Sequence, residues 1–220
     1  MPNRALIEHR PWLAASLVAG VGYYFLWNNP IAEAWLILLK GAGVGFLALY
    51  AMRRTRGLDG AILSIALALS AAADMVLESN FEAGGGLFFA SQCVALALYA
   101  RNIRPQTSAS QKACSAALFI GTPLMAYLLS ARLDIALYSM SLGAMAAFAW
   151  ISRFSRYRVG VGAVLFIISD WLIFSRFGPL DLAPMPEILI WPTYYAAQFM
   201  IATGVVQTLR ADREAPEAYA

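Results

Sequence analysis

The sequence predicts an all-α, polytopic membrane protein with eight transmembrane helices around a polar cavity in the outer half of the bilayer. Of its 220 residues, 60% are hydrophobic and only 13% are charged, whereas a soluble domain carries about 25% charged residues. The apolar residues form eight separate runs, each close to the ~20 residues that a helix needs to cross a bilayer. Polar side chains inside these runs predict the cavity.

The eight runs are bounded by charges, glycines and prolines, and their connections are short, so neighbouring helices are expected to be antiparallel. The first run lacks a convincing cleavage site before Asn28-Asn29-Pro30, which favours an uncleaved span over a signal peptide. The last connection, GPLDLAPMPE, is rich in proline and is not expected to be helical. The expected spans are 11–27, 31–52, 58–78, 84–103, 112–130, 133–152, 159–177 and 188–209.

Together these spans predict one transmembrane domain over residues 11–209, with an N-terminal tail at 1–10 and a C-terminal tail at 210–220. Basic residues predict its orientation, because cytoplasmic loops are enriched in Lys and Arg. Two arginines, Arg132 and Arg176, fall on one side, and Lys40 falls inside a span. Thirteen basic residues fall on the other side: Arg4, Arg10, Arg53, Arg54, Arg56, Arg101, Arg104, Lys112, Arg153, Arg156, Arg158, Arg210 and Arg213. We therefore expect a multi-pass protein of a bacterial inner membrane with both termini in the cytoplasm.

Two aspartates lie inside apolar runs: Asp74 in LSIALALSAAADMVL and Asp170 in VGVGAVLFIISDWLIF. An ionised carboxylate at membrane depth costs at least ~2.5–3.5 kcal/mol, even on the translocon scale. Such residues usually face a protein interior or a water-filled cavity, and they usually carry the function. Asp74 and Asp170 are therefore the candidate catalytic residues.

Four further polar residues lie at a similar depth: Lys40, Gln92, Tyr194 and Gln198. At ~1.5 Å per residue, all six lie roughly 6 to 15 Å from the expected outer ends of their helices. Lys40 could simply neutralise one aspartate in a buried ion pair. Two carboxylates, two amides and a phenol at one level instead favour a shared polar cavity, with these four residues binding substrate.

Ser169 and Arg176 are two weaker candidates for substrate binding. Ser169 directly precedes Asp170, but neighbours on a helix point about 100° apart, so a packing or supporting hydroxyl is favoured over a nucleophile. Arg176 lies at the outer end of its span. It is either a phosphate contact or a side chain that anchors the helix by snorkelling.

Composition excludes several classes of site. The single histidine, His9, rules out zinc sites that need two or more histidines. Cys93 and Cys114 show no metal-ligand or disulfide spacing. Because the basic residues form small clusters at helix ends without a continuous face, a nucleic-acid partner is not expected. No metal or cofactor is predicted.

Three segments resemble the YhhN-like membrane proteins, which include the lysoplasmalogenases. GAVLFIISDWLIFSRF (162–177) resembles the G-x-x-x-F-x-x-S-D segment of that family, and PTYYAAQFMIATG (192–204) resembles its T-Y-Y-x-A-Q-x-x-I-x-x-G segment. LALSAAADMVL is similar to S-x-x-G-D-x-x-L, with Ala73 at the glycine position. The resemblance extends over about residues 35–205.

Individual positions follow the family pattern to different degrees. Lys40 matches the lysine of a Lys-Pro step, with Gly41 in place of the proline, and Tyr138 fits the pattern of the sixth span. Gln92 stands where the family often has a histidine. An amide cannot titrate, so this position is not expected to transfer a proton.

The resemblance implies hydrolysis of the vinyl ether bond of lysoplasmalogens to a fatty aldehyde and a glycerophospho-base. That reaction needs an acid to protonate the alkene carbon and a carboxylate to stabilise the cation or activate water. Asp74 and Asp170 supply such a pair, and Tyr194 and Gln198 would orient a carboxylate or the water. Lys40 or Arg176 would hold the phosphate of the lysophospholipid substrate. Membrane lipids are the other expected partners.

The alternative is a small transporter or lipid-binding membrane protein that uses the same aspartates for an ion, a proton or a headgroup. A carrier needs polar access from both faces of the membrane. The polar residues lie only in the expected outer half, which favours an enzyme with a one-sided cavity. The sequence makes no prediction of the oligomeric state.

Overall fold

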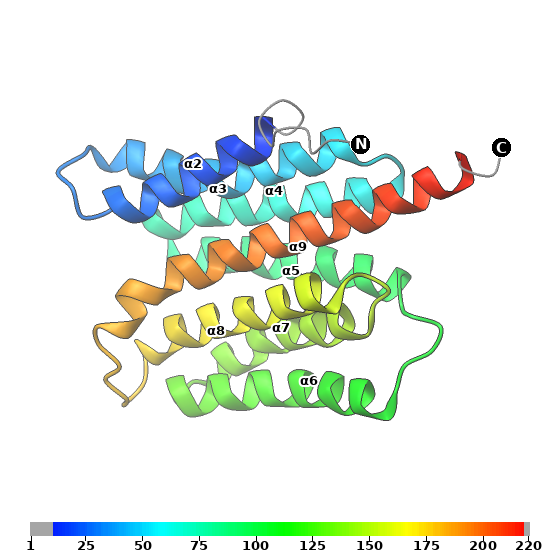
Figure 1. Ribbon diagram of the computed structural model, residues 1–220. Coiled ribbons are helices and arrows are strands. Elements are labelled where there is room, and N and C mark those ends of the chain that lie inside the picture. The colour runs from blue at the N-terminus through cyan, green and yellow to red at the C-terminus, as the bar shows by residue number, and fades with distance from the viewer. Residues whose placement is uncertain (1–10, 218–220) are drawn as a thin grey trace. The chain divides into compact units, whose positions relative to one another are not determined.

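The computed structural model describes residues 11–217, in which the regular secondary structure is helical (Figure 1). The helices are α2 (Pro11–Leu26), α3 (Glu33–Arg54), α4 (Leu58–Ser79), α5 (Phe81–Arg101), α6 (Ala109–Ser130), α7 (Leu133–Ile151), the π-helical turn η1 (Arg156–Gly160), α8 (Val161–Ser175) and α9 (Met185–Glu217). Each of the eight expected spans coincides with one α-helix. Six of them, α3 to α8 with η1 included in the last, are long and apolar enough to cross a membrane. The other two are α2, which is shorter at 16 residues, and α9, which is longer at 33 residues.

The ends of some helices differ from the expected spans because local polar contacts set them. Helix α6 begins three residues early because Ser108 and Gln111 form a capping box. Helix α9 continues past residue 209 through most of the expected C-terminal tail, where Arg210 pairs with Glu214 at 2.9 Å and Asp212 pairs with Arg153 at 2.5 Å. The expected N-terminal tail, 1–10, lies outside the described residues.

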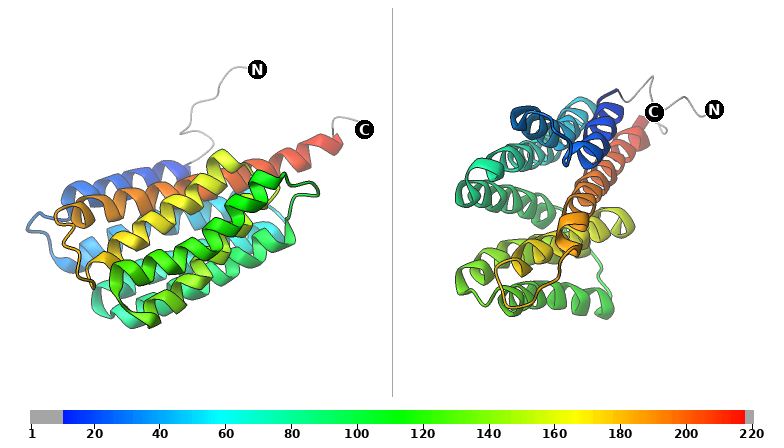
Figure 2. Two further views of the ribbon diagram at one scale, coloured as in Figure 1. Left: turned by 90° about the horizontal axis from the view of Figure 1, so that it is seen from below. Right: turned by 90° about the vertical axis from the view of Figure 1, so that its left-hand side faces the viewer.

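The chain divides into two compact units, Met1–Ser91 and Gln92–Ala220, with the boundary inside α5. In the first unit, α2 packs on α3 and α3 packs on α4 (Figure 2). Gly41 permits the second contact, since a Cβ at this position would lie 2.5 Å from Cγ of Met75. Ser91 attaches α5 to α4 by donating a hydrogen bond to the Ala66 carbonyl at 2.8 Å.

In the second unit, α6 packs on α7, α8 packs on α9, and α8 also contacts α6 and α7. Gly162 allows α8 to approach α9 closely, because a Cβ there would lie 3.0 Å from the Ala197 carbonyl oxygen. Gly143 does the same for α7 against α6, with the Phe119 carbonyl at 3.0 Å. Small residues at helix contacts are typical of membrane bundles.

The connections α5–α6 and α7–α8 bind each other at the end of the second unit that we expect to be cytoplasmic. Arg104 donates its backbone N–H to the Ile151 carbonyl at 3.0 Å, and Arg153 donates to the Asn102 carbonyl at 2.8 Å. The Arg153 guanidinium also donates to the Asn102 side chain at 2.6 Å. These contacts fix the second half of α5 relative to α7, and they thereby position the polar side chains that both helices carry deeper in the unit.

Candidate active site

The polar residues predicted inside the spans face protein rather than open surface. Lys40 is half-buried, and Arg176, at the end of α8, is exposed. The other six are almost fully buried, with exposed fractions of 2% for Asp74, 6% for Asp170, 0% for Gln92, 1% for Ser169, 4% for Tyr194 and 3% for Gln198. Because a polar group exposed to hydrocarbon has no partner, burial is the arrangement that a membrane favours.

In the first unit, Lys40 connects three helices. Its ammonium on α3 forms an ion pair with Glu78 of α4 and lies 5.8 Å from the centre of the Tyr23 ring on α2. Asp74 is one helical turn before Glu78 and lies within electrostatic range of Lys40. The ion-pair alternative expected an aspartate as the partner of Lys40, but the carboxylate that pairs with it directly is Glu78. Sequence reasoning missed Glu78, although its four-residue spacing from Asp74 places both carboxyls on one face of α4.

Replacing Lys40 by Met is expected to lower the free energy of unfolding by about 1–2 kcal/mol. Loss of a fully buried partner costs about 3–5 kcal/mol, but the Glu78 side chain is 37% exposed, so water screens part of its charge. The second substitution Glu78→Leu should recover at least half of the loss. Chemical denaturation in detergent measures both variants.

The matched control is Arg132→Met, which removes an exposed ion pair with Asp134. It should change stability by less than about 0.5 kcal/mol. Equal stability of Lys40→Met and wild type would contradict the structural role of this ion pair.

In the second unit, Asp170 lies at the centre of a stripe along α8. Phe166 is one turn before it and Phe174 one turn after it, so the three side chains share one face of the helix. The Phe166 ring packs edge-on against Tyr194 of α9 at 5.4 Å between ring centres, and the Phe174 ring packs edge-on against Tyr138 of α7 at 6.0 Å. Asp170 is therefore flanked along α8 by contacts to two tyrosines.

A hydrogen-bonded chain runs from α7 to α5 and back. Ser141 donates to the side-chain carbonyl of Gln92 at 2.5 Å, and the Gln92 amide donates to the Tyr138 hydroxyl oxygen at 3.0 Å. Tyr138 also lies within electrostatic range of Asp170. The Tyr138 hydroxyl thus joins the hydrogen-bonded chain on α7 and α5, while its ring packs against Phe174 of α8.

Sequence reasoning did not place Tyr138 or Ser141 in the site. In the sequence, Tyr138 only fits a family pattern, and Ser141 belongs to no motif. The signal was their spacing of three residues on α7, which puts both on the same face of the helix. The Gln92 side chain connects Tyr138 and Ser141. The sequence of α5 does not indicate that these two residues of α7 are its partners.

The Asp170 carboxyl accepts no hydrogen bond and forms no ion pair with the described side chains of its own unit. Its neighbour Ser169 is buried and also lacks a hydrogen-bond partner among the described residues. On its other side, Trp171 donates its indole N–H to the Thr122 carbonyl of α6 at 3.2 Å, which makes Trp171 part of the α6–α8 contact. Asp170 is thus a buried carboxyl that its own unit leaves available to a water molecule or a substrate.

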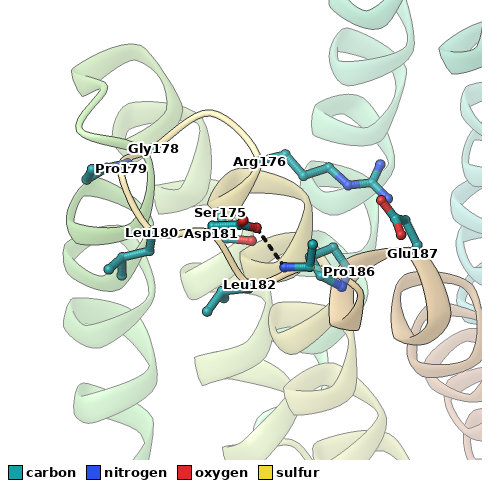
Figure 3. Close-up of a pocket in the computed structure, with 10 residues that line it drawn as sticks. Ser175, Arg176, Gly178, Pro179, Leu180, Asp181, Leu182, Pro186 and Glu187 are labelled. Atoms are coloured by element: carbon teal, nitrogen blue, oxygen red, sulfur yellow. Dashed lines mark hydrogen bonds between the residues drawn. The ribbon is translucent and has the colours of Figure 1, made fainter.

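A cavity of about 360 Å³ opens where the loop after α8 returns to α9, within residues 175–187 (Figure 3). Gly178 holds this loop against the end of α6, because any Cβ there would collide with the Leu129 carbonyl. Three charged residues line the cavity: Arg176, Asp181 and Glu187. Figure 3 shows the Arg176 and Glu187 side chains pointing toward one another.

The chain matches the model of one protein family. The YhhN family model matches residues 35–205, which contain all eight candidate site residues. The chain belongs to the YhhN family. This family includes lysoplasmalogenase, so the resemblance inferred from the S-D and T-Y-Y motifs is confirmed. No curated protein and no solved structure matches the chain significantly.

Membership and helix composition together make this YhhN protein an integral multi-pass membrane protein. The predicted site residues are distributed over its two units. The first contains Lys40 and Asp74, and the second contains Gln92, Asp170 and the tyrosines around it.

In this YhhN protein the side-chain amide of Gln92 both donates and accepts a hydrogen bond, and an amide does this without gaining or losing a proton. Gln92 therefore holds Tyr138 in place rather than carrying a proton.

Proposed function

We propose that this YhhN protein is a lysoplasmalogenase-like hydrolase that cleaves the vinyl ether bond of lysoplasmalogens by aspartate acid/base catalysis. The observation that carries the proposal is the environment of Asp170. It is a buried carboxyl in the family's S-D segment, between two tyrosine contacts and without a polar partner in its own unit. Such a group suits proton transfer to a bound apolar substrate.

The reaction needs no covalent nucleophile. An acid protonates the β-carbon of the vinyl ether, and the α-carbon becomes an oxocarbenium ion. Water adds to the α-carbon and gives up a proton to the second carboxylate, and the resulting hemiacetal breaks down to the fatty aldehyde and the glycerol hydroxyl. We propose Asp74 and Asp170 as this acid/base pair, in a polar cavity in the outer half of the membrane.

The remaining candidates have distinct proposed roles. Gln92, held by Ser141, fixes the position of the Tyr138 hydroxyl. Tyr194 and Gln198, one turn apart on α9, orient the water or a carboxylate. Lys40 is engaged with Glu78, which supports a role in holding Asp74 rather than the substrate phosphate. The expected charge asymmetry supports an orientation with both termini in the cytoplasm, and the location that we propose is a bacterial inner membrane.

A substrate screen tests the reaction class. The purified full-length protein in detergent is assayed with a lysoplasmalogen, with the lysophospholipid that carries an acyl ester at the same position, and with the saturated 1-alkyl ether. Fatty aldehyde is expected from the vinyl ether alone, because only an alkenyl carbon can be protonated to an oxocarbenium ion.

Two results would contradict the hydrolase. The first is an absence of aldehyde from every substrate, and the second is release of fatty acid from the ester at a comparable rate. Binding of the lysoplasmalogen without turnover would instead support the lipid-binding alternative. Uptake of protons or an ion into vesicles that contain the protein would support the transporter.

A further inference from the structure

We propose that the cavity within residues 175–187 is the recognition site for a zwitterionic headgroup, and that it prefers phosphoethanolamine to phosphocholine. This inference rests on the proposed function, because it places the headgroup of the same substrate. It names a site, defined here as the α8–α9 pocket, and a headgroup class that the family match does not assign.

The charges of the α8–α9 pocket match a phosphate linked to an amine. Arg176 presents a guanidinium and Glu187 a carboxylate, and Figure 3 shows the two side chains directed toward one another. Neither side chain has a hydrogen bond or ion pair within the described part of its unit. A guanidinium binds phosphate oxygens through paired N–H donors, and a carboxylate accepts hydrogen bonds from an ammonium.

Other basic side chains near the expected outer ends of the helices are already engaged. Lys40 pairs with Glu78, and Arg132 pairs with Asp134 at 2.5 Å. Among the described residues at that end, Arg176 is thus the cation left available to a phosphate. This comparison decides between the two phosphate-binding candidates, Lys40 and Arg176, in favour of Arg176.

The position of the pocket along α8 fits the dimensions of the substrate. Arg176 follows Asp170 by six residues, which corresponds to about 9 Å along the helix axis. In a lysoplasmalogen, six bonds separate the vinyl ether α-carbon from phosphorus, which is about 7–8 Å when extended. A headgroup phosphate at Arg176 therefore leaves the vinyl ether near the level of Asp170.

The lining of the pocket distinguishes a primary from a quaternary amine. Quaternary ammonium groups are typically held in cages of aromatic rings, by cation–π contacts. Apart from its charged residues, this pocket is lined by prolines, leucines and small residues, and no Phe, Tyr or Trp lines it. A primary ammonium instead needs hydrogen-bond acceptors, which Glu187 and Asp181 provide. One Asp181 oxygen accepts the Ala183 N–H at 2.9 Å, which holds that carboxylate in place.

Binding measurements with ester-linked lysolipids test the pocket without requiring turnover. Lysophosphatidylethanolamine and lysophosphatidylcholine with the same acyl chain are titrated into the purified protein in detergent. We expect the ethanolamine lipid to bind at least about tenfold more tightly. Arg176→Gln should weaken binding of both lipids about tenfold, and Glu187→Gln should abolish the preference for ethanolamine.

The matched controls are Arg210→Gln and Glu214→Gln, which remove an exposed ion pair near the other end of α9. They should change each affinity by less than about twofold. Glycerophosphoethanolamine has the same headgroup but no hydrocarbon chain. Its affinity therefore distinguishes a site for a lipid headgroup from a site for a free, water-soluble phosphoethanolamine compound. It should bind at least about tenfold more weakly than the lysolipid, because chain burial contributes much of the affinity.

Equal affinity for the two lysolipids, unchanged binding by Arg176→Gln, or equally tight binding of glycerophosphoethanolamine would each overturn the lipid headgroup site. These results are independent of the reaction. If aldehyde is released but the preference is absent, the pocket assignment fails and the hydrolase stands. If the preference and its loss in the variants are found without any aldehyde, the hydrolase fails and the pocket stands.

Discussion

Replacing Asp170 by Asn lowers kcat for aldehyde release from a lysoplasmalogen by at least about 10³-fold, because it removes the proton transfer assigned to this carboxyl. General acid–base catalysis contributes about 10²–10⁴-fold, and 10³-fold corresponds to about 4 kcal/mol of activation free energy. Asn has nearly the same shape as Asp, so the contacts of Phe166 and Phe174 along α8 should persist. Steady-state kinetics of the purified variant, with aldehyde as the measured product, give the result.

The matched control for this variant is Asp134→Asn. Asp134 is an exposed aspartate in the first turn of α7, paired with Arg132. Its replacement should leave kcat within about twofold of wild type and stability within about 0.5 kcal/mol. If Asp170→Asn folds normally and retains more than a tenth of the wild-type kcat, Asp170 is not the acid or the base.

The Asp74→Asn variant is expected to lose activity to a similar extent, at least about 10³-fold in kcat. Lys40 keeps its direct ion pair with Glu78 in this variant, so the first unit should remain folded. The more informative measurement is the double variant. Residues that act as a unit in one catalytic step have strongly non-additive effects. Asp74→Asn combined with Asp170→Asn should therefore be no slower than the slower single variant.

This comparison tests whether the two carboxyls belong to one site. Independent roles would multiply, and the double variant would then be slower by the product of the two single effects. Multiplication, or near-normal activity of Asp74→Asn with unchanged thermal stability, would overturn the acid/base pair. Circular dichroism and the melting temperature in detergent exclude loss of activity through unfolding.

The helices could be predicted from the sequence because the membrane imposes a length and a composition on them. Eight apolar runs of about 20 residues became eight helices, and short polar connections separated them. The ends were less predictable, because they depend on specific contacts. The Ser108–Gln111 capping box extends α6 toward its N-terminus, and the Arg153–Asp212 ion pair, between residues 59 positions apart, accompanies the extension of α9.

The candidate site was predictable as a set of residues but not as a set of partners. Asp74, Asp170 and Gln92 stand out as costly polar groups in apolar runs, and their burial agrees with that reasoning. Glu78 was not expected to be the partner of Lys40, and Tyr138 was not expected to bind Gln92. Both partnerships join different helices, and the sequence spacing of 38 and 46 residues carries no signal for them.

By itself, the sequence determined the membrane class, the helices and the family of this protein, because hydropathy, span length and the S-D and T-Y-Y motifs are local properties of the chain. Only the tertiary structure decided which basic side chain is available to bind a phosphate. Lys40 is engaged by Glu78, whereas Arg176 faces a cavity with Glu187. The physical reason is that the availability of a charge depends on the neighbours that packing brings to it, and those neighbours come from distant parts of the chain.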